Sequence, residues 1–296
     1  MKRQNKNSKK IASAASMLLL STAMLGMATY AWFTMNKEVS VTGMKVEATA
    51  SEGLVISGDN KSTWQTDWNV NMTAGVKIYP TSTSGKPAEW AVAYSKAFDD
   101  AYKNQTQSGA TGYTNLSMSY TTSGTTGSTF VQALDEGVGY AIKGSGSSET
   151  QNYVLKKTFF IKSTGDAALS KNLRIKEVTA TNTVNGGSGS ANLNKALRVL
   201  VVVNGASTGT IYAPIDGYDN DTKFKGSTAL TPIAKNTATN TSVTSIPNTN
   251  EGAVRVDMYM YYEGEDTNCK SSNITAISVD TLNISAKFDY VDNNNN

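Results

Sequence analysis

The sequence predicts an all-β protein, namely a jelly-roll-like antiparallel β-sandwich with one short helix and long polar loops. Apolar and polar residues alternate with a period of two along many short segments, and turn-forming residues separate these segments. The chain has 24 glycines and only 5 prolines, and its polar positions are mostly serine, threonine and asparagine, as in a β-rich extracellular domain. No long linker divides the 296 residues, so we expect one folded domain.

The N-terminus has a basic segment followed by an apolar one, the pattern of a secretory signal peptide. The first ten residues are basic and polar, and residues 11–31 contain no charged side chain. Thr29 and Ala31 are small residues at positions −3 and −1 of a cleavage site, so we expect removal of residues 1–31, with Trp32 beginning the mature chain. The alternative is a retained membrane anchor, because this uncharged segment is long enough to span a bilayer.

Residues 32–50 form the predicted N-terminal strand region. Within it, residues 33–42 place their apolar side chains on one side of a period-two pattern and their polar side chains on the other, as in a strand with one buried face. Lys37 is the single polar residue on the apolar side. We expect this strand to pair with another sheet through four apolar residues: Phe33, Met35, Val39 and Val41.

The sandwich domain is predicted over residues 51–292, followed by a polar tail at 293–296. Asn204 and Gly205 predict a hairpin between two of its strands. Aromatic and small apolar residues recur at three- and four-residue steps over 88–104, which predicts the single helix. Alternation predicts strands within 44–50, 52–58, 75–80, 153–163, 172–184, 196–205, 209–215, 252–264 and 274–291.

The charge balance argues against nucleic-acid binding. The chain carries a net charge of +3, but five of its 27 basic residues precede the apolar segment. Removal of residues 1–31 takes away those five and none of the 24 acidic residues, which leaves a net charge of −2. A near-neutral mature chain without a basic patch lacks the electrostatic signature of a nucleic-acid-binding protein.

The chain contains no histidine, which excludes Ser-His-Asp and Cys-His catalysis and histidine-based zinc sites. Glycosidase chemistry needs only two carboxyl groups, but no pair stands out, so we expect a protein without enzymatic activity. Cys269 is the only cysteine, so no intrachain disulfide can form. We expect a buried thiol there, with an intermolecular bridge as the alternative.

Two short segments are candidate binding sites. Asp216, Asp219 and Asp221 offer oxygen ligands suited to Ca²⁺, although their spacing does not follow the EF-hand order, and a solvated turn is the alternative. Trp64 and Trp68 lie four residues apart in a polar region. This spacing is compatible with stacking against sugars, and tryptophans that pack in the core are the alternative.

The N-terminal stretch KKIASAASMLLLSTAMLGMATYAWFT resembles the signal and mature start of the TasA and camelysin family of Gram-positive surface proteins. Thr29, Tyr30, Ala31 and Phe33 fit the family pattern, whereas Trp32 replaces the usual small residue, so the cut could fall one residue later. The stretches VRVDMYMYYEGED and LNISAKFDY are similar to the family's closing strands. The resemblance implies export by a dedicated signal peptidase, a jelly-roll domain and polymerisation into biofilm matrix fibres.

In that family the mature N-terminal strand of one subunit completes the sheet of the next. We therefore expect a secreted structural subunit that forms head-to-tail homopolymers and contacts other matrix proteins or glycans. Camelysins have also been classed as metalloproteases, but without histidine that activity does not carry over. The alternative function is a monomeric cell-surface adhesin or glycan-binding domain, in which the N-terminal strand pairs within its own domain.

Overall fold

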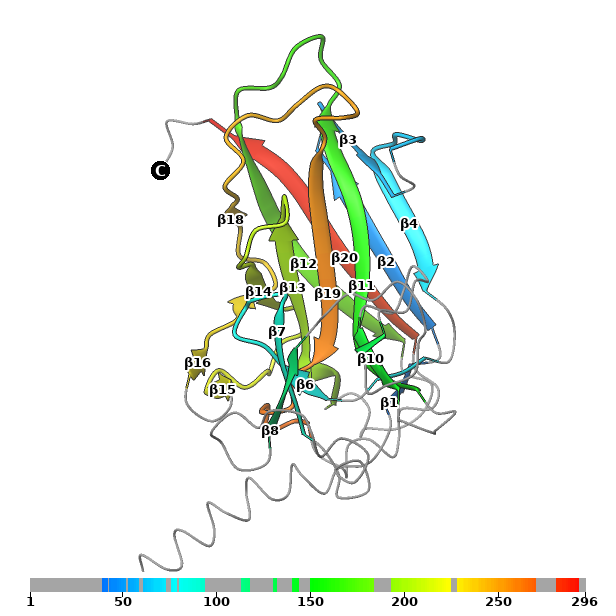
Figure 1. Cartoon of the computed structure of the whole chain (residues 1–296). Coiled ribbons are helices and arrows are strands. Elements are labelled where there is room, and N and C mark those ends of the chain that lie inside the picture. The colour runs from blue at the N-terminus through cyan, green and yellow to red at the C-terminus, as the bar shows by residue number, and fades with distance from the viewer. Residues whose placement is uncertain are drawn as a thin grey trace, which may run out of the picture.

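A computed structural model of the chain describes residues 39–41, 43–51, 53–58, 61–72, 76–78, 80–93, 113–117, 130–131, 140–143, 150–183, 193–224, 228–269 and 281–292. Two β-sheets pack face to face along most of this part of the chain (Figure 1). The predicted all-β sandwich is therefore confirmed. The signal segment 1–31 and the tail 293–296 lie outside the described residues.

The five-stranded sheet contains strands from both ends of the described chain. Its order is β18-β12-β20-β2-β4. The central strand β20 pairs antiparallel with β12 and parallel with β2, so the N-terminal part of the domain lies beside its last strand. The bounds are β2 Gly43–Ala50, β4 Asp67–Met72, β12 Asn172–Thr183, β18 Thr239–Asn240 and β20 Thr281–Val291.

The ten-stranded sheet follows the order β1-β5-β11-β19-β13-β14-β17, and β3, β9 and β10 join it at β11. Its longest strand, β11, pairs with β19 along its middle and with β3 toward its end. The bounds are β1 Val39–Val41, β3 Leu54–Ser57, β5 Val76–Ile78, β9 Phe130–Val131, β10 Tyr140–Lys143, β11 Thr150–Ser163, β13 Leu197–Val203, β14 Thr210–Ala213, β17 Ile233–Ala234 and β19 Val254–Tyr262.

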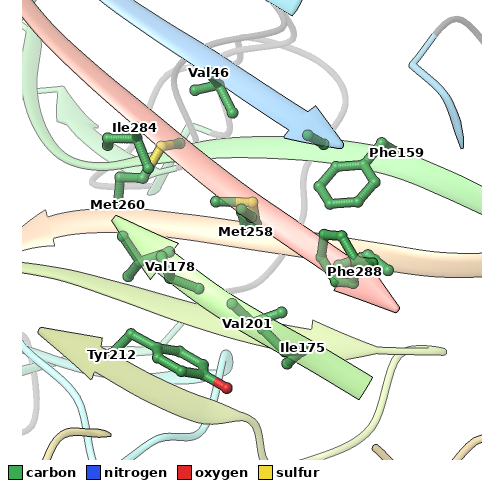
Figure 2. Packing of buried hydrophobic residues seen from close by; sticks show 14 of the residues in the cluster. Val46, Phe159, Ile175, Val178, Val201, Tyr212, Met258, Met260, Ile284 and Phe288 are labelled. Atoms are coloured by element: carbon green, nitrogen blue, oxygen red, sulfur yellow. The ribbon is translucent and has the colours of Figure 1, made fainter. Parts of the chain in front are cut away.

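The core lies between the two sheets, where inward-facing side chains from both interdigitate (Figure 2). Phe159 from β11 and Phe288 from β20 meet edge to face, with ring centres 5.4 Å apart. Every residue of β13 is buried, as expected for an apolar strand covered on both faces. Figure 2 labels core residues from both sheets: Val46, Phe159, Ile175, Val178, Val201, Tyr212, Met258, Met260, Ile284 and Phe288.

A small third layer covers part of the outer face of the ten-stranded sheet. It is a three-stranded sheet of β6 (Thr81–Ser82), β7 (Glu89–Ala93) and β8 (Tyr113–Ser117). Trp90 of β7 is fully buried, with its ring centre 5.0 Å from that of Tyr261 and 6.2 Å from that of Tyr259. These two tyrosines alternate along β19 with Met258 and Met260, which face the core. A separate hairpin joins β15 (Thr222–Phe224) to β16 (Thr228–Leu230).

The predicted helix over 88–104 is wrong where the structure describes it. Residues 89–93 form β7, paired on both sides with β6 and β8, and residues 94–104 lie outside the described part. Aromatic spacing suggested a helical stripe, but Trp90 is buried by packing across strands, and tertiary pairing overrides a short periodic pattern. In the part of the chain that the structure describes, the helical element with assigned bounds is a 3₁₀ turn, η1 (Asn194–Ala196).

Most strand pairs are antiparallel, and three are parallel: β2–β20, β5–β11 and β14–β17. The predicted hairpin between β13 and β14 is confirmed. Asn204 and Gly205 both adopt positive φ angles, 50° and 67°, in the loop that joins these strands. Asparagine and glycine tolerate this left-handed region, which explains why this pair marked the turn in the sequence.

Candidate functional site

The predicted assembly strand lies partly in β1. Val39 and Val41 pair antiparallel with β5 of the same chain, opposite Ile78 and Val76. The other two predicted residues, Phe33 and Met35, lie outside the described residues, as do the cleavage-site residues Thr29, Ala31 and Trp32. The paired part of the strand thus occupies a sheet edge of its own chain.

Residues 39–41 of β1 and 76–78 of β5 form a two-stranded ribbon, which we call the β1–β5 ribbon. Few residues pair this ribbon with the rest of the sandwich. β1 is the last strand in the order of the ten-stranded sheet. β5 pairs with β11 at one position, Ile78 beside Asn152. Among the described residues, the ribbon therefore depends on one strand junction for its place in the sheet.

The strands on the two sides of residue 42, β1 and β2, differ in how many strands they pair with. β2 lies between β20 and β4, with both of its edges paired. Val46 and Ala48 of β2 are fully buried in the core. Residues 43–50 are therefore an integral strand of the five-stranded sheet, whereas residues 39–41 belong to the edge of the other sheet.

The three aspartates proposed as calcium ligands are not brought together. Asp216 forms an ion pair with Lys235, with Nζ and Oδ2 2.6 Å apart. Asp219 accepts hydrogen bonds from the backbone N–H groups of Asp221 and Thr267. Burial acts to raise the pKa of Asp219, but these hydrogen bonds outweigh it and lower the pKa. Within the described residues, no group of three or more His, Cys, Asp or Glu side chains is arranged to hold a metal ion.

The two tryptophans proposed as a sugar platform have separate packing roles. Trp68 is 8% exposed and lies in the core cluster, with Lys157 Nζ 5.0 Å from its ring centre. Trp64 is half-buried, and Lys162 Nζ lies 4.6 Å from its ring centre. Because Trp68 is buried, the pair does not present two exposed ring faces to a glycan.

A buried polar cluster lies where β19 ends, and we call it the Glu263 cluster: Arg198, Tyr261, Glu263, Asp266 and Cys269. Arg198 comes from β13 and forms an ion pair with Asp266, with Nη2 and Oδ2 2.6 Å apart and both side chains buried. The guanidinium also donates to the backbone carbonyls of Lys195, Leu197 and Asp219. These bonds satisfy the charge of Arg198 inside the protein, as a buried charge requires.

The cluster holds two carboxyl groups and only one guanidinium, and Asp266 takes the direct contact with it. Glu263 is 1% exposed, and its Oε1 accepts a hydrogen bond from the backbone N–H of Glu265. Burial raises the pKa of Glu263 to about 8, although the positive charge of Arg198 acts to lower it. At neutral pH the Glu263 carboxyl group is therefore mostly protonated.

The Tyr261 hydroxyl and the Cys269 thiol are also uncharged at neutral pH. Burial raises the pKa of the Tyr261 hydroxyl, and Glu263 raises it further. Burial likewise raises the pKa of the Cys269 thiol, with added repulsion from Asp266 and Glu263. Cys269 is 3% exposed, so the predicted buried thiol is confirmed.

Sequence reasoning gave no role to Arg198. The signal was present as a single arginine within an otherwise apolar strand, LRVLVVV, all of whose residues are buried. A charge at such a position needs a buried partner of opposite charge, but the sequence does not say which carboxylate supplies it.

Comparison with protein-family models, with curated proteins and with solved structures finds no match to this chain in any of the three. Within the residues that the structure describes, no helix is long and apolar enough to cross a membrane.

Proposed function

We propose that the protein is a secreted structural subunit of extracellular fibres, in which the N-terminal strand of one copy pairs with a sheet of the next. The observation that supports the proposal is the difference in strand pairing between β1 and β2. β1 is an edge strand of three residues beside a narrowly joined partner, whereas β2 has both edges paired and buried side chains. The secretory signal predicted over 1–31 and the resemblance of the N-terminus to TasA and camelysin proteins agree with it.

Strand exchange explains how such a strand produces assembly. When β1 leaves its place, β5 exposes unpaired backbone N–H and C=O groups, which favours the addition of another strand. β1 of a second copy can form the same pairs, Val39 with Ile78 and Val41 with Val76, so the exchange adds no new kind of contact. Repeated head to tail, such a contact builds a filament, whereas reciprocal exchange between two copies stops at a dimer.

A cysteine pair tests the exchange directly. In the variant Val39→Cys/Ile78→Cys, the two new cysteines face each other in register, so oxidation of dilute monomer should lock β1 onto its own β5. We expect locked protein to form no filaments in electron microscopy and to recover filament formation after reduction. Protein oxidised after assembly should instead show a ladder of disulfide-linked subunits on a non-reducing gel.

The matched control is Val39→Cys/Lys77→Cys, because neighbouring residues of a strand point to opposite faces and these two cysteines cannot bridge. Oxidation should not change its assembly. If the locked Val39–Ile78 variant assembles as well as the reduced one, exchange of β1 is excluded. N-terminal sequencing of exported protein tests the secretion step, and the expected first residue is Trp32.

The second candidate function is a monomeric surface adhesin, which is favoured by the pairing of β1 with its own β5. In that case β1 stays in place permanently. A monomeric mass at every concentration, together with binding to purified glycans, is the result that favours this candidate over the fibre subunit.

A further inference from the structure

The β1–β5 ribbon is connected directly to the third layer of the protein. β5 ends at Ile78 and β6 begins at Thr81, with the buried Pro80 between them. Because only two residues connect them, β5 and β6 cannot move far apart. A displacement of β6 is therefore transmitted to β5, and through β5 to β1.

β6 is fastened to the end of β19 at Glu263. Thr81 forms a parallel bridge with Glu263, and its carbonyl accepts a hydrogen bond of 3.0 Å from the backbone N–H of Gly264. Thr81, Ser82 and Thr83 are fully buried. β6 is thus paired at Glu263 itself, which is 1% exposed and has almost no contact with solvent.

Among the described residues, several elements contribute polar or titratable groups to the surroundings of Glu263. Arg198 comes from β13, Tyr261 from β19, and Glu265, Asp266 and Cys269 from the residues after β19. From β6, the Ser82 side chain favours the ionised form of Glu263, but its hydroxyl group does not reach hydrogen-bonding geometry with a described residue. The single positive charge in this set is Arg198, which is bound to Asp266.

We propose that β6 stays on the sandwich through its backbone contacts while the Glu263 carboxyl group is protonated, and that ionisation of this buried group releases β6 together with the β1–β5 ribbon. An ionised Glu263 in this buried position is a second negative charge beside one guanidinium, with almost no water to solvate it. Movement of β6 away from β19 hydrates the carboxylate and removes this penalty. The consequence for assembly rests on the fibre function proposed above.

The direction of the pH effect follows from the two states of Glu263. Its pKa is about 8 when it is buried, and near its ordinary value of 4.5 when it is hydrated. Opening therefore releases a proton between these two values. The free energy needed to move β6 away from β19 therefore falls as the pH rises from about 4.5 to about 8, and it does not depend on pH above that range.

Hydrogen exchange measured by mass spectrometry on the full mature chain tests this inference. We expect the protection factors of peptides covering 76–85 to be highest at pH 5, to fall by up to about tenfold per pH unit toward pH 8, and then to level off. In Glu263→Gln, which is neutral at every pH, the protection of these peptides should not depend on pH. Peptides from β12 and β20 should keep their protection throughout and serve as the internal reference.

The matched control is Glu251→Gln, the same substitution at an exposed residue before the start of β19, which should behave as the natural protein does. Protection that does not change with pH in the natural protein, or that falls equally in Glu263→Gln, overturns the inference. Electron microscopy at pH 5 and pH 8 supplies the separate readout, with more filaments expected at pH 8. If the exchange follows Glu263 but no filaments form at either pH, the release of β6 stands and the fibre function fails.

Discussion

β1 and β2 are neighbouring strands with similar sequence patterns and opposite structural situations. Both alternate valine or alanine with polar residues, as in VSV and GMKVEATA, and only residue 42 separates them. β2 is paired along eight residues with β20 and along six residues with β4, whereas β1 is paired along three residues with β5 alone. The difference shows that alternation identifies a strand, while the number of neighbouring strands decides whether it can leave the sheet.

We therefore expect β2 to contribute mainly to the stability of the fold and β1 mainly to assembly. Burying an aliphatic side chain stabilises a fold by about 1.5–3 kcal/mol, so Val46 and the residues packed around it contribute to global stability. An edge strand contributes mostly backbone pairing that another strand can replace. Substitutions in the core should therefore change the free energy of unfolding, and substitutions in β1 should change assembly.

The largest expected effect is that of Phe159→Ala in the core between the sheets. The substitution removes the edge-to-face contact with Phe288 and the packing against Trp68, and leaves a cavity. We expect the free energy of unfolding to fall by about 3–5 kcal/mol, measured by urea denaturation. A loss below about 1 kcal/mol would contradict the core position of this residue.

The next effect is that of Arg198→Met in the Glu263 cluster. It leaves the Asp266 carboxylate buried without its partner, and we expect a loss of about 3–5 kcal/mol in urea denaturation. The matched control is Arg174→Met, which breaks the bidentate pair with Asp289 at a partly exposed site and should cost about 1 kcal/mol or less. Equal losses in the two variants would show that burial does not set the strength of the Arg198 pair.

The smallest effect on stability is expected for Val39→Ser/Val41→Ser in β1. The free energy of unfolding should change by less than about 1 kcal/mol, because β1 has a single neighbouring strand. Filament formation followed by electron microscopy should fall strongly in the same variant. A large loss of stability would place β1 with β2 as an integral strand and remove the contrast between the two regions.

Most of the long strands could be predicted from the sequence, whereas two of the shorter ones could not. β12, β13, β19 and β20 fall within predicted segments, and β11 begins three residues before its predicted segment. β4 was missed although DWNVNM alternates polar and apolar residues, because it directly follows a polar stretch around Trp64 and looks like a continuation of it; the structure pairs it with β2. β7 was read as a helix because the aromatic spacing around Trp90 does not reveal that this ring packs on two tyrosines of β19.

The candidate site shows the same limit. The N-terminal assembly strand could be proposed from local alternation, and Asp216, Asp219 and Asp221 from local spacing. Whether three aspartates share a site depends on partners distant in sequence, and Asp216 pairs with Lys235 while Asp219 turns toward Asp221 and Thr267. The Glu263 cluster joins residues from β13 and β19, a combination that no local pattern contains.

The sequence by itself determined the fold class, the hairpin at Asn204-Gly205 and the absence of histidine chemistry. These properties follow from composition, from side-chain periodicity and from the local φ preferences of asparagine and glycine. Only the tertiary structure decided that β2 is locked between β20 and β4, that β1 occupies an edge, and that Glu263 is buried beside Arg198 and paired with β6. The physical reason is that strand pairing and desolvation depend on groups brought together from distant parts of the chain.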